Sequence, residues 1–392
     1  MPLSGVRVVD LTRIIAGPFC TMLLADLGAD VIKIEPPGDG DPLREQGEKV
    51  EGLSWYYASY NRNKRSLSVD LRSDAGKEVL ARLIERSDVL VENYRPGVLT
   101  KMGFPPDRLQ QLNPRLVVGS VSGFGADGPY AQRPAFDFIA QAMSGYMSVN
   151  GAEGSEPLRT GIPISDLVAG LYGALGIVAA LHARGQTGQG QQVGISLLDG
   201  LVSFLSFMAS NYLATGKAPL RTGNDHPLVA PYGLFAASDG PIAVAPSHVG
   251  IYERLLKALG LERLRDDPDF ATNALRMQNR DRLRAEIEAV TRHHSQAHWI
   301  EHLNAAGVPC GPVLDLAQVF RDPQVMHQEM VIDVPHPGRG TVRMHGFPLK
   351  FSGTPCRMRR PAPELGADTR AVLVELGYDQ PTIASMQQRG IV

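Results

Sequence analysis

The feature that most constrains the fold is the alternation of short β-rich runs with amphipathic helical patterns over the first 125 residues. Pro18 stands early in the first helical pattern, where proline is tolerated, and Ser73 or Asp74 can cap a later one. Strands that alternate with such helices are typical of βαβ units and a parallel sheet, whose ligands bind beyond the carboxyl ends of the strands. The runs expected as strands are 6–11, 30–35, 68–71, 89–93 and 116–123.

The rest of the chain predicts a second, smaller α/β domain inserted into the first. A small-residue helix is expected from about Asp166 to Arg184, and its charged ends and glycines favour a buried helix over a membrane span. A polar, proline-rich connector then indicates a domain boundary. The predicted class is therefore α/β, with a Rossmann-like parallel-sheet large domain. The boundaries are a large domain at 1–215 completed by 330–392, a linker at 216–225 and a small domain at 226–329.

Charge and cysteine content exclude several classes of protein. Lys plus Arg is 39 and Asp plus Glu is 41, so the net charge is −2, unlike that of a dedicated nucleic-acid binder or a polybasic membrane-surface protein. The 3 cysteines are far apart and form no CxxC pair, which fits a reducing compartment. The N-terminus shows no signal-peptide pattern, and a cytoplasmic location is expected.

Two motifs suggest ligand sites but are better explained by ordinary structure. GFGADG at 123–128 matches a dinucleotide fingerprint, yet Pro129 and Pro134 follow it instead of a helix, so a glycine-rich turn is expected. His294, His298 and His302 share a helical spacing that could bind zinc. No acidic or cysteine partner completes that set, so no metal site is predicted.

Two further segments remain open on local chemistry alone. The cations of NRNKRSLSVDLR at 61–72 could hold phosphate oxygens or form a solvated loop. In PISDLVAG, Ser165 or Asp166 could cap a helix, or Asp166 could act as a carboxylate nucleophile among small residues. In the second case the helix N-terminus is expected to keep the carboxylate ionised.

Several motifs in this order resemble the class III CoA-transferases, the family of formyl-CoA transferase and carnitine CoA-transferase. The resemblance covers nearly the whole chain and is closest to the succinate–hydroxymethylglutarate type, including APYG at 230–233 and HPG at 336–338. The other matching segments are RVVDLTRIIAGPFCTMLLADLGADVIKIE, NRNKRSLSVDL, VENYRPG, LVVGSVSGFGADGPY, PISDLVAGLYGALGIVAAL, the GQG turn and PAPELGADT.

The resemblance implies transfer of CoA from an acyl-CoA thioester, with succinyl-CoA as the expected donor, to a small carboxylic or dicarboxylic acid. It places the nucleophile at Asp166, which would form a mixed anhydride and then an aspartyl-CoA thioester. Acyl-CoA and the acid are substrates, and no tightly bound cofactor is expected. The resemblance also implies an interlocked homodimer and gives no nucleic-acid or membrane partner.

The resemblance further places CoA along the carboxyl ends of the large-domain strands. Ile15 and Pro36 depart from the formyl-CoA:oxalate pattern of glutamine and arginine, which makes oxalate a less favoured acceptor. Tyr232, Ser247 and His248 of the small domain are further guesses at substrate contacts. The residues expected to bind CoA are Arg13, Ile14, Ile15, Ala16, Arg72, Asn93, Tyr94, Arg95 and Lys101, with phosphate pairing assigned to Arg72 and Lys101.

Two other functions are kept as alternatives. A 2-methylacyl-CoA racemase or epimerase of the same fold would need a histidine where this chain has Phe136, so that alternative lacks an acid/base partner. A non-catalytic module that binds CoA or a dinucleotide is the third hypothesis.

Overall fold

The computed structural model describes residues 1–392, which form two compact units. Unit 1 contains Met1–Tyr146, Thr160–Ser206 and Gln324–Val392, and unit 2 contains Met147–Arg159 and Phe207–Pro323. Unit 2 thus includes residues 147–159, which the sequence prediction counts with the large domain. The other domain boundaries predicted from the sequence stay a prediction.

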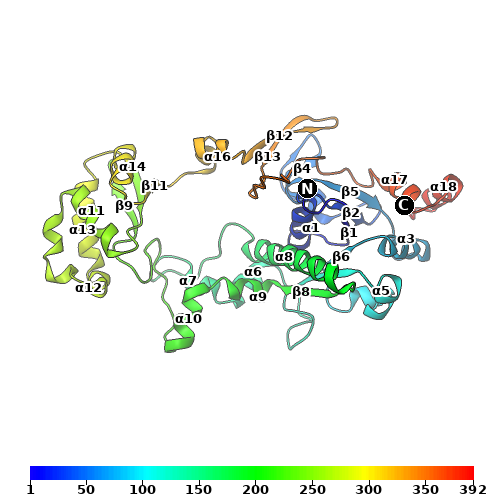
Figure 1. The fold of residues 1–392 in the computed structure, drawn as a ribbon, viewed down its shortest axis with the longest axis horizontal. Helices are drawn as coiled ribbons and strands as arrows, with labels where there is room; N and C mark the ends of the chain where they lie inside the picture. The colour runs from blue at the N-terminus through cyan, green and yellow to red at the C-terminus, as the bar shows by residue number, and fades with distance from the viewer. The chain divides into compact units, whose positions relative to one another are not determined.

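A six-stranded parallel sheet forms the centre of unit 1, as predicted (Figure 1). Its order is β5-β2-β1-β6-β7-β8, so the chain builds outward from β1 in one direction and then in the other. This is the doubly wound arrangement, in which ligands bind where the strand order reverses, here between β1 and β6. The strands are β1 (Arg7–Asp10), β2 (Asp30–Glu35), β5 (Lys64–Ser68), β6 (Val89–Glu92), β7 (Val117–Ser122) and β8 (Gln192–Ser196).

Helices cover both faces of this sheet because its side chains alternate between two apolar cores. Val8, Val31 and Val89 point to one core, which α1 (Ala16–Asp26) and α8 (Ile164–Thr187) close. Val9, Ile32 and Leu90 point to the other core, which the helices on the opposite face close. These helices are α3 (Asp74–Glu85), α5 (Pro106–Leu112), α17 (Thr369–Glu375) and α18 (Gln380–Gln388), so the end of the chain completes the large unit.

Three local predictions need correction or refinement. The third strand is β5 at Lys64–Ser68 rather than 68–71, because Lys64 finds an ion partner, Asp10, in the interior. The apolar segment after β8 forms two helices, α9 (Leu197–Ser203) and α10 (Ser206–Thr215), with a break at Ser206, which has a φ of 52°. Ser73 caps α3 by accepting a hydrogen bond from the Gly76 N–H, whereas neither Ser165 nor Asp166 caps α8.

Helix α8 is long and apolar enough to cross a membrane by length and composition alone. Half of its most apolar stretch is buried, and it packs against α1 and β7. It therefore serves as a core helix of unit 1, as the sequence predicts. The other elements of unit 1 are η1 (Pro42–Glu45), β3 (Lys49–Val50), β4 (Leu53–Ser54), α2 (Trp55–Asn61), α4 (Val98–Lys101), α6 (Asp137–Met143), α16 (Pro323–His327), β12 (Val331–His336) and β13 (Gly340–His345).

Unit 2 has its own core around a three-stranded antiparallel sheet of order β11-β10-β9. Phe235, Ile242 and Val244 of this sheet pack against Leu255 and Trp299 of the helices that cover it. The strands are β9 (Gly233–Ala237), β10 (Gly240–Val244) and β11 (Cys310–Pro312). The helices are α7 (Tyr146–Val149), α11 (Val249–Leu259), η2 (Glu262–Arg265), η3 (Pro268–Phe270), α12 (Asn273–Gln278), α13 (Arg280–Thr291), α14 (Gln296–Ala305) and α15 (Leu316–Val319).

Candidate functional site

The turns that follow β1 and β6 meet where the strand order of the sheet reverses. Asn93, directly after β6, holds the first turn with both ends of its side-chain amide. Its Oδ1 accepts the Arg13 N–H at 3.0 Å, and its Nδ2 donates to the Arg13 carbonyl at 2.8 Å. The two turns therefore form one continuous wall at the position where an open α/β sheet binds ligands.

This wall borders a cleft of about 380 Å³ in unit 1. Eight of the residues predicted as catalytic or CoA-binding line it: Arg13, Ile14, Ile15, Ala16, Asn93, Tyr94, Arg95 and Asp166. Among the lining residues, Arg13, Arg95 and Arg133 are cationic and Asp166 is the single carboxylate. The cleft can thus attract an anionic ligand and present one nucleophilic oxygen group to it.

Arg72 and Lys101 do not line this cleft. The Arg72 side chain is 90% exposed and pairs with Asp70 at 2.9 Å, while Lys101 is exposed at the end of α4. Their assignment to CoA phosphates stays a prediction.

Asp166 lies in the first turn of α8 and faces a second carboxylate from α6. The backbone N–H of Ser165 donates to Asp137 Oδ1 at 2.9 Å, and the Ser165 hydroxyl donates to the same oxygen at 2.9 Å. Gln141 donates to the other oxygen of Asp137 at 2.7 Å. Asp137 thus takes the place of a side-chain cap at the start of α8 and leaves the Asp166 carboxylate free of that task.

The electrostatic surroundings of Asp166 correct the expectation that the helix N-terminus keeps it ionised. Burial, and then the negative charge of Asp137, raise the pKa of Asp166 to about 7. A helix terminus stabilises a nearby negative charge by only about 0.3–1 kcal/mol, and burial and the charge of Asp137 outweigh it here. Asp166 is therefore a poorly solvated carboxyl group that is only partly ionised near neutral pH.

Close packing of α1 and α8 fixes Asp166 relative to the turn after β1. A Cβ atom at Gly170 would lie 2.6 Å from the Ala16 carbonyl oxygen and 2.9 Å from Phe19, so only glycine allows this approach. Gly173 likewise faces Cys20 of α1. The small residues of α8 therefore serve helix packing, and the open approach to Asp166 comes from the cleft itself.

Over most of its length, the basic segment at 61–72 forms neither a solvated loop nor a phosphate site. Arg62 is buried against Asp26 at 2.7 Å, and Lys64 is fully buried against Asp10 at 3.0 Å. Arg65 pairs with Glu375 at 2.6 Å and ties β5 to α17. These ion pairs build the fold, so the hypothesis that the segment surrounds an anionic cofactor is wrong for these residues.

Sequence reasoning missed several residues that border Asp166. Arg133 lines the cleft, beside Phe136, which the sequence had already singled out and whose side chain is 70% exposed. The rings of Tyr56 and Tyr60 of α2 are tilted against each other, with centroids 6.0 Å apart, and pack in the cluster that includes Leu167, next to Asp166. Arg133 could have been noticed as a cation in the glycine-rich segment, but nothing in the sequence links α2 to α8.

The remaining candidates lie elsewhere. The GFGADG segment forms a turn after β7, and no helix begins before Asp137. His294, His298 and His302 stack on one another at the surface of unit 2 and meet the Trp299 ring edge-on, and no metal-ligating group of three or more residues is present. The guesses Tyr232, Ser247 and His248 also lie in unit 2 and stay predictions.

Comparisons with known proteins agree with the resemblance. The model of CoA-transferase family III matches residues 3–369. Acetyl-CoA:oxalate CoA-transferase of Acetobacter aceti is 40% identical over 95% of each chain. Human succinyl-CoA:glutarate CoA-transferase is 37% identical over 100% of this chain and 90% of its own.

The fold is shared with solved structures of similar length. A CaiB/BaiF family protein from Brucella suis matches with a TM-score of 0.85 and 38% identity, over 96% of this chain and 99% of its own. The relatives are named as CoA-transferases, so the racemase alternative is not favoured. The chain belongs to CoA-transferase family III and is an enzyme of the class III CoA-transferase type.

Proposed function

We propose that this enzyme transfers CoA from succinyl-CoA to a small carboxylic or dicarboxylic acid through an Asp166-CoA thioester. The observation that carries the proposal is the position of Asp166, the one carboxylate among the residues that line a cleft with Arg13, Arg95 and Arg133. Arginines suit the phosphates of CoA and the carboxylates of both acids. A half-buried carboxylate with a raised pKa suits nucleophilic attack.

The proposed reaction splits one exchange into four acyl transfers. The Asp166 carboxylate attacks the thioester carbonyl of the donor, which releases CoA thiolate and leaves a mixed anhydride. The thiolate then attacks the aspartyl carbonyl, which forms the Asp166-CoA thioester and releases the donor acid. The acceptor carboxylate displaces CoA thiolate to give a second anhydride, and the thiolate attacks the acceptor's acyl carbon. New acyl-CoA leaves, and the Asp166 carboxylate is restored.

The choice of substrates rests on the relatives and on two positions in this chain. Relatives are named for succinyl-CoA with glutarate, D-citramalate or mesaconate, and others for acetyl-CoA or formyl-CoA with oxalate. Ile15 lines the cleft as an aliphatic side chain, and Pro36 offers no side-chain donor. We propose succinyl-CoA as donor and keep oxalate among the acceptors to be tested.

The Phe136 side chain supports transfer over racemisation. It lines the same cleft as Asp166, and a phenyl ring cannot take up or release a proton. A racemase needs a second acid/base group at the substrate α-carbon. We expect no exchange of deuterium into a 2-methylacyl-CoA, and wash-in at that carbon would favour the racemase.

The homodimer implied by the resemblance is part of the proposal. Leu171 and Leu175 of α8 are 51% and 62% exposed although α8 is a core helix, and Phe204, directly after α9, is also exposed. Apolar side chains gathered on packed helices are typical of a surface that a partner covers. A cytoplasmic location and the absence of a tightly bound cofactor stay predictions.

Incubation with succinyl-CoA, without an acceptor, tests the covalent step. We expect mass spectrometry to find a CoA adduct on the peptide that carries Asp166 of the wild type. Asp166→Ala should form no adduct and lose at least about 10³-fold in kcat, because the nucleophile is gone. Asp107→Ala removes an exposed carboxylate from the first turn of α5 and is the matched control, with expected wild-type activity. Full activity of Asp166→Ala would refute the mechanism.

A panel of donors and acceptors tests the substrate classes. Succinyl-CoA, acetyl-CoA and formyl-CoA should be offered against glutarate, hydroxymethylglutarate, citramalate, mesaconate, malate, itaconate and oxalate. We expect the highest kcat/KM with succinyl-CoA and a dicarboxylic acid larger than oxalate. A preference for oxalate would contradict the argument from Ile15 and Pro36.

A further inference from the structure

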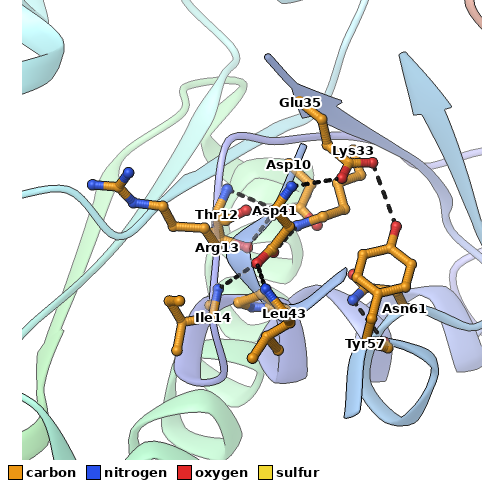
Figure 2. Close-up of polar contacts among 12 residues, drawn as sticks. Asp10, Thr12, Arg13, Ile14, Lys33, Glu35, Asp41, Leu43, Tyr57 and Asn61 are labelled. Atoms are coloured by element: carbon orange, nitrogen blue, oxygen red, sulfur yellow. Dashed lines mark hydrogen bonds and ion pairs between the residues drawn. The ribbon is translucent and has the colours of Figure 1, made fainter. Parts of the chain in front are cut away.

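A cluster of buried charges lies behind the turn that follows β1 (Figure 2). The ammonium of Lys33 and the carboxylate of Asp41 are 2.9 Å apart, and their side chains are 0% and 1% exposed. Asp10, Lys64 and Glu35 complete the cluster with further buried contacts. Removing such groups from water costs several kcal/mol per ion, so their contacts must provide something that an apolar core would not.

The turn itself has an unfavourable backbone conformation. Ile14 has a φ of 70°, in the left-handed region that β-branched residues avoid. A conformation of this kind costs about 1–3 kcal/mol and persists only where the surroundings hold it in place. Ile14 lies in the wall of the cleft that contains Asp166, so this strain occurs at the proposed site.

The buried cluster makes hydrogen bonds with the backbone of the turn. The Thr12 carbonyl accepts from Lys33 Nζ at 2.8 Å, and the Thr12 N–H donates to Asp10 at 2.9 Å. The Ile14 N–H donates to Asp41 Oδ1 at 3.2 Å. Together with the two bonds from Asn93 to Arg13, these contacts fix three consecutive residues of the turn.

Asp41 connects the turn to the rest of the cluster. Its Oδ1 also accepts the Leu43 N–H at 3.0 Å, and its own N–H donates to Glu35 at 3.0 Å. Although burial opposes it, Asp41, Asp10 and Glu35 raise the pKa of Lys33, so the ammonium stays charged. Asp41 does not line the cleft, whereas its neighbour Pro42 does. Asp41 therefore contacts the wall of the site and not the space that substrate would occupy.

We propose that Asp41 is a positioning residue for the transferase site. Together with Lys33, Asp41 holds the Thr12–Ile15 turn in the conformation that receives acyl-CoA opposite Asp166. The inference rests on the proposed binding of acyl-CoA in this cleft. Without the Asp41 acceptor, Ile14 returns to a negative φ, and the wall moves relative to Asp166. A shift of about 1 Å in a catalytic site can cost about 10²-fold in rate.

Steady-state kinetics of Asp41→Ala tests the inference. We expect the KM for the donor and the Kd for CoA to rise at least about tenfold. The amount of Asp166-CoA adduct at saturating donor should stay that of the wild type, because the nucleophile is intact. Asp41→Asn keeps an oxygen toward the Ile14 N–H and should recover most of the affinity. A purely structural role would lower the number of active sites and leave KM unchanged.

Asp26→Ala is the matched control. This variant also removes the acid from a buried ion pair, since Asp26 pairs with Arg62 and the two side chains are 7% and 1% exposed. Asp26 makes its side-chain hydrogen bonds with Arg62 and Asn63 and none with the turn. We expect a lower Tm for this variant and a wild-type KM. An equal rise of KM in both variants, or wild-type KM and Kd in Asp41→Ala, would overturn the inference.

If Asp41→Ala does not fold, Lys33→Met/Asp41→Ala replaces it. In the double variant the Lys33 ammonium is removed together with its partner, so no unpaired charge stays buried. The variant still lacks the hydrogen bonds from Asp41 to Ile14 and from Lys33 to Thr12. If the wild type exchanges no CoA, the proposed function fails. The Kd of wild type and variant for CoA, measured by calorimetry, still shows whether Asp41 shapes the site.

Discussion

A carboxylate that attacks a thioester gains reactivity when water solvates it poorly, and Asp166 meets this condition. Burial and the nearby charge of Asp137 raise the pKa of Asp166 to about 7. Above that pH the carboxylate is ionised and can act as the proposed nucleophile, and below it the group is protonated and cannot. We therefore expect kcat/KM to fall as the pH decreases through about 7.

Asp137 is the residue that allows this explanation to be tested. Asp137→Asn keeps a side-chain oxygen for the Ser165 N–H and removes the negative charge near Asp166. Since a like charge raises the pKa of a carboxyl, its loss should move the acid limb of the pH profile to lower pH. Burial is the larger cause, so we expect the pKa to stay above the ordinary value of 3.8. An unchanged limb would contradict the pairing of the two carboxylates.

At the scale of helices and strands, sequence patterns predicted the elements whose side chains follow a simple period. Strand β2 has the predicted bounds, and α3 has the predicted cap. Strand β5 was misplaced because a run of basic residues normally indicates solvent, and here Lys64 and Arg65 bind acids from other elements. Such pairings join residues far apart in the chain, which no local pattern reveals.

The contact of α1 with α8 leads to a prediction for Gly170. A methyl group there would push the helices apart, so Gly170→Ala should cost about 1–3 kcal/mol in stability. It should also lower activity, because Asp166 moves with α8. Gly185→Ala is the control in the same helix, where a Cβ meets nothing within 4 Å. We expect this control to be neutral or to gain up to about 1 kcal/mol. Thermal unfolding and initial rates measure both effects, and equal behaviour of the two variants would refute the packing argument.

At the scale of the whole molecule, the sequence predicted the class of sheet and the strand ends that border the cleft of the candidate site. The predicted residues of two turns and the start of α8 do line one cleft. Arg72 and Lys101 do not, because strand ends indicate an edge of the sheet but not which side chains turn into a cavity. The role of Asp41 was equally hidden, since a buried ion pair behind a turn leaves no signature in one sequence.

The proposed homodimer gives the last prediction. Helices α6, α8 and α9 pack together and leave Phe138, Leu175 and Phe204 exposed, although such side chains are normally buried. We expect light scattering to give twice the mass of one chain. Leu171→Glu/Leu175→Glu should lower the Tm and the yield of this species, because charges would enter the interface. Val374→Glu on α17 changes an apolar side chain that is 48% exposed outside this surface and should leave both unchanged. A wild-type mass of one chain at micromolar concentration would contradict the dimer.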